Sequence, residues 1–438
     1  MADDQNGGSS GGNNSGSSNS GGNGGRSRRN GSNNNNRGGR KRNRNRGRGG
    51  NSGGGNNGGG GGRGKADNSH PGKPIVGMLE MIGDKNFGFI REFHPSLPKG
   101  DNDPFMPPPI IDKYNLRDGV LIEGTIKPGR KGAWQVTDLD KVMGVPADEW
   151  KEVESYDDGI TIYPNEKLNL VTSPTDITMR VVDLVAPLGK GQRALIVAPP
   201  RSGKTVILKE LARALEANHP EVELVALLVD ERPEEVTDFK RTTKCTVFAS
   251  SNDYEEDNHV RVATLAYEYS RRLVEQGKDV VMLLDSLTRL GRTFNLWGGN
   301  SGRTMSGGLD ARALVIPRKI FGAARNIEHG GSLTIIATAL IETGSRMDDV
   351  IFEEFKGTGN SEIVLDRKVA DKRVFPAMDI LKSGTRKEDL LVDKVDLQKT
   401  YVLRRILNPM GTTDAIEFLI SKLKQTKTNS EFFDSMNT

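Results

Sequence analysis

The chain has 438 residues and a formal net charge of +4, from 62 Lys and Arg against 58 Asp and Glu. Cys245 is the only cysteine, which excludes an intramolecular disulfide and favours a reducing compartment. No apolar run approaches the ~18 residues that a membrane span needs, and the N-terminus lacks the apolar stretch of a signal peptide. We therefore expect a soluble, cytoplasmic protein with no membrane partner.

Residues 1–73 are predicted to be a disordered Gly/Asn/Arg-rich tail, because they contain too little apolar surface to offset the entropy cost of ordering. Residues 1–70 hold 12 Lys and Arg against 3 Asp and Glu, a net charge of +9, so the rest of the chain carries −5. The Arg-rich stretch 37–48 is typical of an arm that binds nucleic acid phosphates. The alternative is a solubilising tail with no partner of its own.

Residues 74–145 contain short strand-like runs separated by Gly, Pro and Asp, which predicts a small β-barrel of the OB or cold-shock type. The expected strands are Ile75–Met81, Phe87–Phe93, Val120–Ile126 and Ala133–Val136. Residues 146–179 are mixed in character and punctuated by Pro. We interpret them as a connector.

From residue 180 to 438, apolar strands alternate with helical patterns, so we expect an α/β domain in which helices cover a parallel sheet. The expected strands are Arg193–Ala198, Leu224–Val229, Asp279–Leu284 and Ser332–Ala339. A final amphipathic helix presents its apolar face through Ile416, Leu419, Ile420 and Leu423.

The strongest chemical signal is a phosphate-binding loop, APPRSGKT at residues 198–205, between an apolar strand and an amphipathic helix. It predicts a RecA-like P-loop ATPase domain, and the alternative is a chance match in a strand–turn–helix. Lys204 is expected to reach the β- and γ-phosphates of ATP, and the Thr205 hydroxyl to bind Mg²⁺. The expected nucleotide-binding residues here are Pro199, Pro200, Arg201, Ser202, Gly203, Lys204, Thr205 and Val206.

Two carboxylates follow apolar strands at the sheet edge where the loop is expected. Asp285 is predicted to hold Mg²⁺ through water. Glu231 is predicted to orient or deprotonate the attacking water, and the alternatives are a helix N-cap neighbour or a surface ion pair. Phosphoryl transfer also needs a cation for the charge on the γ-phosphate. The candidates, between which physics alone does not choose, are Arg367, Arg373 and Arg386.

A candidate RNA site lies in the predicted barrel. Phe87, Phe89 and Arg91 alternate along one strand, so their side chains point to the same face. Exposed aromatics at this spacing form a stacking platform for bases, with the guanidinium on a phosphate or base edge. The alternative is that both phenylalanines belong to the barrel core.

Two polar, Gly-rich stretches, 297–308 and 343–349, interrupt the α/β domain. Such loops are usually functional, so we interpret them as elements that grip the substrate of a motor, with plain surface loops as the alternative.

From Pro74 to near the C-terminus the chain resembles the family of bacterial transcription termination factor Rho. The matching motifs are FGFIR at 87–91, APPRSGKT at 198–205, DERPEEVTD at 230–238, LLDSLTRLGR at 283–292, TALIETGSRMDDVIFEEFKGTGN at 338–360 and RVFPAMDILKSGTRKEDLL at 373–391. The resemblance implies a homohexameric, RNA-dependent ATPase that moves 5′ to 3′ along nascent single-stranded RNA and dislodges RNA polymerase. It also implies sensitivity to the antibiotic bicyclomycin at Arg232 and Ser286.

Residue roles follow from the matching motifs. The implied RNA contacts are Phe87, Phe89, Arg91 and Phe105 in the primary site and Arg303, Thr304 and Arg346 in the two pore loops. The implied ATP and Mg²⁺ ligands are Lys204 and Thr205, with Arg201 near the phosphates, Arg232 beside them, Asp285 for the metal and Phe375 stacking on adenine. Glu231 matches the catalytic glutamate, Arg386 the arginine finger from a neighbouring subunit, and Arg373 the same inter-subunit network.

The chain departs from the family in one respect. Low-complexity sequence occupies the place of a small helical bundle that usually precedes the barrel, so the Arg-rich stretch 37–48 is a candidate substitute for it. Two other functions stay open: a different RecA-like ATPase, such as a rotary ATP synthase-type subunit, and a non-catalytic RNA-binding protein.

Overall fold

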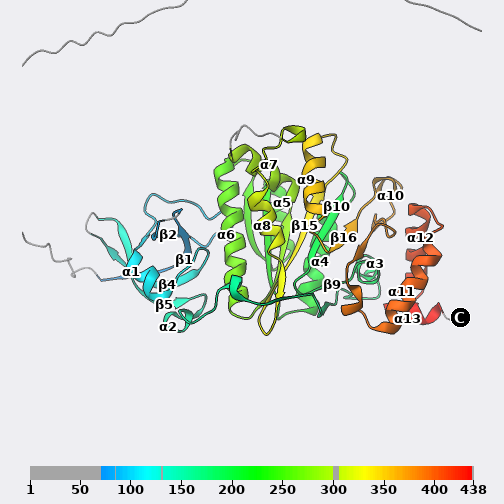
Figure 1. The fold of residues 1–438 in the computed structure, drawn as a ribbon, viewed down its shortest axis with the longest axis horizontal. Helices are drawn as coiled ribbons and strands as arrows, with labels where there is room; N and C mark the ends of the chain where they lie inside the picture. Colours follow the sequence, from blue (N-terminus) through cyan, green and yellow to red (C-terminus); the bar gives the residue numbers. More distant parts are fainter. Residues whose placement is uncertain (1–70, 84, 130–131, 299–304, 437–438) are drawn as a thin grey trace, which may run out of the picture. The chain divides into compact units, whose positions relative to one another are not determined.

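The computed structural model describes residues 71–83, 85–129, 132–298 and 305–436. Within these residues the chain forms a β-barrel followed by an α/β domain (Figure 1). Of the predicted tail, only residues 71–73 fall inside the described part.

The strands of the barrel follow the order β3-β2-β1-β4-β5-β6, and β3 also pairs with β5 through Phe105 and Gln135. This last pairing closes the sheet on itself, as the strand spacing predicted. The elements are β1 (Lys73–Met81), β2 (Gly88–Arg91), β3 (Phe105–Met106), α1 (Pro108–Tyr114), β4 (Leu121–Pro128), β5 (Trp134–Val142), β6 (Val145–Pro146) and α2 (Ala147–Trp150). The predicted strand 87–93 is therefore shorter than expected.

The α/β domain contains a mostly parallel sheet in the order β12-β11-β13-β15-β10-β16-β17. Its strands are β10 (Arg193–Ala198), β11 (Glu223–Glu231), β12 (Thr246–Ser251), β13 (Asp279–Asp285), β15 (Ser332–Leu340), β16 (Ser361–Val364) and β17 (Gly384–Thr385). The first of these has the predicted bounds, whereas β12, β16 and β17 were not predicted.

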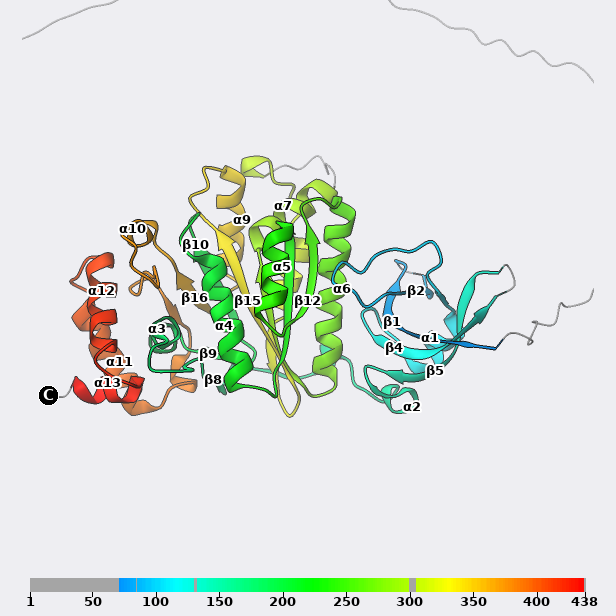
Figure 2. The same cartoon turned by 180° about the vertical axis from the view of Figure 1, so that it is seen from behind.

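Helices cover both faces of this sheet: α8 lies over it in Figure 1, and α4 and α5 lie over the other face in Figure 2. Alternate residues of each strand, such as Leu195 and Ile196, enter two separate apolar cores. The first core contains α6 (Glu256–Glu275), α7 (Leu287–Trp297), α8 (Val315–Gly322) and α9 (Arg346–Lys356). The second contains α3 (Ile177–Val185), α4 (Lys204–Asn218), α5 (Pro233–Thr242), α10 (Arg367–Asp371), α11 (Lys394–Leu407), α12 (Thr412–Leu423) and α13 (Asn429–Ser435).

The segment interpreted as a connector contributes to the α/β domain. Its strand β7 (Thr161–Ile162) pairs with β14 (Arg325–Ile327), which itself pairs with β15. Its strand β8 (Lys167–Leu168) pairs with β9 (Leu188–Gly189). Strands of two residues carry too little periodicity to be predicted from sequence.

Candidate nucleotide and RNA sites

The phosphate-binding loop joins β10 to α4 at the carboxyl edge of the parallel sheet. Gly203 has a φ angle of +96°, which glycine adopts without steric cost. The Ser202 Oγ atom donates to the Pro199 carbonyl at 2.7 Å and braces the turn. Among the described residues, no side chain caps the first turn of α4. Its N–H groups are therefore free of side-chain competition for phosphate oxygens.

The predicted nucleotide-binding residues differ in exposure. Pro199 and Ser202 are buried, Pro200, Gly203, Lys204 and Thr205 are half-buried, and Arg201 and Val206 are exposed. Exposed Arg232 precedes α5 and pairs with Glu235 at 3.3 Å.

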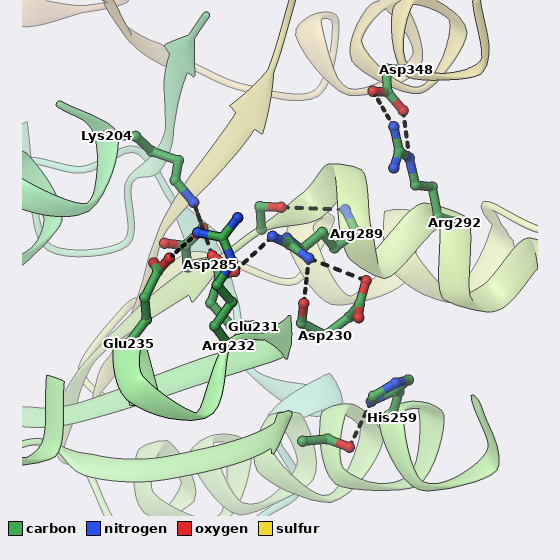
Figure 3. Close-up of polar contacts among 12 residues, drawn as sticks. Lys204, Asp230, Glu231, Arg232, Glu235, His259, Asp285, Arg289, Arg292 and Asp348 are labelled. Carbon is green, nitrogen blue, oxygen red and sulfur yellow. Dashed lines mark hydrogen bonds and ion pairs between the residues drawn. The ribbon is translucent and has the colours of Figure 1, made fainter. Parts of the chain in front are cut away.

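Lys204 and two carboxylates meet at the carboxyl edge, as the strand pattern predicted (Figure 3). The Lys204 ammonium donates to Oδ1 of Asp285 and lies 3.7 Å from Oε1 of Glu231. Asp285 and Glu231 are only 1% and 3% exposed, because each ends a strand of the buried sheet. The alternative that Glu231 is a surface ion pair is therefore wrong.

Burial raises the pKa of Glu231 to about 7. The neighbouring Asp285 charge also raises it, while Lys204 and Arg289 lower it. A carboxyl group that titrates near neutral pH is suited to accept a proton from water.

Two further residues complete this cluster and were not singled out from sequence. Arg289 of α7 places Nη2 2.9 Å from Oε2 of Glu231 and also donates to the Asp230 carbonyl. The Thr338 hydroxyl of β15 donates to Oδ1 of Asp285 at 2.8 Å. Arg289 lies in the first turn of the helix that follows Asp285. This closeness in sequence to the predicted metal ligand could have pointed to it.

The predicted arginine finger and adenine-stacking residues lie outside the cluster. Arg386, Arg373 and Phe375 are exposed. Within the described residues, no hydrogen bond or ion pair joins any of them to Lys204 or Glu231. Because β16 pairs with β10 in parallel, the chain after β16 starts at the edge that carries the phosphate-binding loop. Phe375 belongs to this segment and is 51% exposed.

The aromatic residues of the barrel form a compact platform, defined here as Phe87, Phe89 and Phe105. Their ring centroids are 5.5 to 6.2 Å apart, and Phe89 pairs with Phe105 across β2 and β3. All three rings are half-buried, whereas Ile90 points into the barrel and is 1% exposed. The platform therefore lies outside the barrel core and offers ring surface for stacking.

Arg91 differs from the expected free surface cation. It is 5% exposed, and its guanidinium lies 5.3 Å from the Phe89 ring centroid. It pairs with both Glu80 and Asp103. Its position beside the platform thus depends on two carboxylates that the sequence pattern did not indicate.

The described end of the first predicted pore loop, residues 305–308, lies beside the start of the second at Arg346 and Met347. A Cβ atom on Gly307 would stand 2.8 Å from the carbonyl oxygen of Arg346 and from the amide nitrogen of Met347. Arg346 is exposed at the start of α9. Arg303 and Thr304 lie outside the described residues.

None of the helices in the described part of the chain combines the length and apolar character needed to cross a membrane.

Comparison with known proteins assigns separate families to the barrel and to the α/β domain. Residues 75–148 match the family model "Rho termination factor, RNA-binding domain", and residues 178–385 match "ATP synthase alpha/beta family, nucleotide-binding domain". The chain thus contains an RNA-binding domain and an ATPase-type domain that binds ATP. A solved ATPase of a bacterial type III secretion system has the same fold, with a TM-score of 0.52 and 22% identity over 63% of this chain and 85% of that one.

Relatives with higher identity cover the barrel and the α/β domain together. Transcription termination factor Rho of Cereibacter sphaeroides is 60% identical over 83% of this chain and 87% of that protein. The Rho protein of Pseudomonas aeruginosa is 51% identical over 82% of this chain and 87% of that protein. This chain belongs to the transcription termination factor Rho family.

Proposed function

We propose that this protein is an RNA-dependent ATPase that terminates transcription by moving 5′ to 3′ along the nascent RNA and releasing RNA polymerase. One observation carries the proposal: a single chain joins an aromatic platform on an RNA-binding barrel to an assembled cluster of Lys204, Glu231 and Asp285. A rotary ATPase subunit has no need for the platform, and a passive RNA-binding protein has no need for the cluster.

In ATP hydrolysis, Lys204 leaves its carboxylate partners to contact the β- and γ-phosphates, because phosphate oxygens offer it a higher density of negative charge. Glu231 then orients the attacking water and takes its proton on a carboxylate oxygen. Arg289 holds the Glu231 side chain in position during this step. Arg201, Arg232 and Phe375 line the remaining sides of the nucleotide.

The donor set fits Mg²⁺. Thr205 supplies a hydroxyl oxygen and Asp285 a buried carboxylate oxygen, and this hard cation prefers oxygen ligands. Mg²⁺ commonly uses one or two protein carboxylates and completes its shell with water and substrate phosphates. Bound there, the ion supplies charge neutralisation to the phosphates.

The exposed Arg386 supports a ring of subunits. A cation that stabilises γ-phosphate charge must reach the nucleotide, yet Arg386 has no contact with the cluster of its own chain in the described residues. Arg386 can meet this need if it enters the nucleotide site of a neighbouring subunit, with Arg373 in the same contact between subunits. Head-to-tail contacts of this kind generate rings when they close. We infer a homohexamer in which Arg303, Thr304 and Arg346 grip RNA in the central channel.

The test is ATP hydrolysis by the full chain with and without pyrimidine-rich single-stranded RNA, together with a mass measurement. We expect strong stimulation by RNA and the mass of a hexamer. Equal hydrolysis without RNA would indicate a rotary type of ATPase. RNA binding without hydrolysis under either condition would indicate a passive RNA-binding protein.

A further inference from the structure

A cluster of four charged side chains, three of them buried, links the RNA platform to the ATPase domain. Arg91 of β2 pairs with Glu80 of β1 and with Asp103, which precedes β3. Glu80 also accepts from Arg261, whose Nη1 atom lies 3.3 Å away. Arg261 belongs to α6 of the ATPase domain, so one carboxylate of the barrel is shared by two arginines from different domains.

The cluster is well enclosed and electrically balanced. Glu80, Arg91 and Arg261 are 8%, 5% and 9% exposed, and two carboxylates face two guanidinium groups. Breaking a buried charge pair by removing one partner leaves the other charge desolvated and uncompensated. Loss of Arg261 would therefore be relieved by movement of Glu80 toward water, and Arg91 would lose one of the two carboxylates that orient it.

Arg261 is itself held from both domains. It donates to the carbonyl oxygens of Leu97 and Ser96 in the barrel and, at 3.0 Å, to Asn258 Oδ1 one turn earlier in α6. This gives its planar guanidinium one orientation, which a lysine side chain could reproduce only in part.

The surrounding contacts keep this part of the barrel against the ATPase domain. The amide of Ala249 in β12 donates to the Pro95 carbonyl at 2.9 Å. Phe93 stacks edge-on against Phe248, with centroids 5.9 Å apart, and lies 5.6 Å from Tyr269. The segment 93–97 thus brings the shared cluster within reach of α6.

We propose that Arg261 is a positioning residue for the RNA platform: acting through Glu80, a helix of the ATPase domain sets the orientation of Arg91 beside Phe89 and so tunes the affinity of the barrel for single-stranded RNA. This inference rests on the proposed function, in which the platform binds RNA. It assigns to the ATPase domain a direct part in RNA capture by the barrel.

The test compares Arg261→Gln with a matched control, Arg117→Gln. Arg117 also bridges the barrel to α6, through Glu275 at 3.4 Å, but it belongs to neither the platform nor the shared cluster. The readout is the affinity of the full chain for a dye-labelled, pyrimidine-rich single-stranded RNA without nucleotide, with thermal unfolding recorded alongside.

We expect Arg261→Gln to weaken RNA binding by about two- to thirtyfold, the usual range for coupling through a network, and Arg117→Gln to leave it unchanged even if its unfolding temperature falls. Arg261→Lys should recover part of the affinity. In an Arg91→Gln background, Arg261→Gln should have no further effect. The ATPase rate at saturating RNA should stay near that of wild type, while the RNA concentration for half-maximal rate rises.

Equal affinity of Arg261→Gln and wild type would overturn the inference, as would additive losses with Arg91→Gln. An equal loss of RNA affinity in Arg117→Gln would also overturn it, because the cause would then be a general loosening of the contact between barrel and ATPase domain. Should Arg261→Gln fail to fold, Glu80→Gln gives the same comparison, with weaker RNA binding expected and unchanged binding contradicting the role. Phe89→Ala distinguishes failure of this inference from failure of the proposed function. If this variant binds RNA normally, the platform is not the RNA site.

Discussion

Arg289 holds Glu231 by an ion pair, with Nη2 2.9 Å from Oε2, inside a site where burial opposes ionisation of the same carboxyl. The two influences are opposed, and burial is the larger, so the pKa of Glu231 is raised to about 7. A group that must be ionised to accept a proton is thereby left near its titration midpoint at neutral pH.

Hydrolysis is therefore predicted to increase with pH through about 7, because in the proposed mechanism the ionised form of Glu231 accepts the proton of the attacking water. The pH profile of kcat/KM for ATP at saturating RNA reports this group in the free enzyme. Glu231→Gln should lower the rate by about 10²- to 10⁴-fold and remove this limb of the profile. A profile that is flat between pH 6 and 8 in the wild type would contradict the assignment.

Lys204→Ala is predicted to lower ATP hydrolysis by ~10²-fold or more, because it removes the cation that meets the phosphates. RNA binding in the absence of nucleotide should be unchanged, since Lys204 pairs with Glu231 and Asp285 and, among the described residues, with no group of the barrel. Lys209→Ala is the control: this lysine lies in the same helix but pairs with Asp238. A Lys204→Ala variant that still separates an RNA–DNA duplex with ATP would show that the site is assigned wrongly.

Arg386→Ala is predicted to keep ATP binding but to lower turnover by up to ~10³-fold. If the finger acts on a neighbour, mixing Arg386→Ala subunits with Lys204→Ala subunits restores interfaces that carry both groups, and activity should return above that of either variant alone. Lys387→Ala, a change at the adjacent exposed residue, should have full activity. Turnover by Arg386→Ala in a monodisperse monomer would refute the trans role.

Asp118 is predicted to make stability depend on pH. It accepts from the amide of Met81 at 3.0 Å, and burial raises its pKa to about 7. The folded state favours the protonated Asp118 carboxyl. Its contribution to the free energy of unfolding is therefore present near pH 4 and is lost as pH rises through about 7. Asp118→Asn should therefore be more stable than wild type at pH 8 by about 1–3 kcal/mol, and the difference should vanish near pH 4.

Chemical denaturation of both proteins across this range measures the difference. Asp112→Asn, which changes an exposed carboxylate that accepts from Asn86, is the control and should show no such trend. A stability difference for Asp118→Asn that is the same at pH 4 and pH 8 would rule out the titration.

Much of the nucleotide site could be predicted because its residues follow continuous apolar strands. The strand Arg193–Ala198, the loop after it, and the carboxylates Glu231 and Asp285 all depend on local patterns that meet at one sheet edge. Strand β12, in contrast, has the sequence TVFASS, in which only three consecutive residues are apolar, and so short a run does not stand out in the sequence.

The surroundings of Arg91 could not be predicted for a different reason. Its partners Glu80 and Asp103 belong to separate segments, and Arg261, which shares Glu80 with it, belongs to another domain. No local period connects such residues, so the alternation of Phe87, Phe89 and Arg91 indicated the correct strand face but not the ion pairs that enclose the guanidinium.

Arg292 of α7 donates two hydrogen bonds, at 2.7 and 2.6 Å, to the carboxylate of Asp348 in α9 (Figure 3). Asp348 is fully buried. Helix α7 begins two residues after Asp285, and α9 begins with Arg346. A planar fork of this kind resists both sliding and rotation. The two helices are therefore clamped to one another, so that a shift of α7 next to Asp285 would move the start of α9, and with it Arg346 of the predicted pore loop, in the same direction.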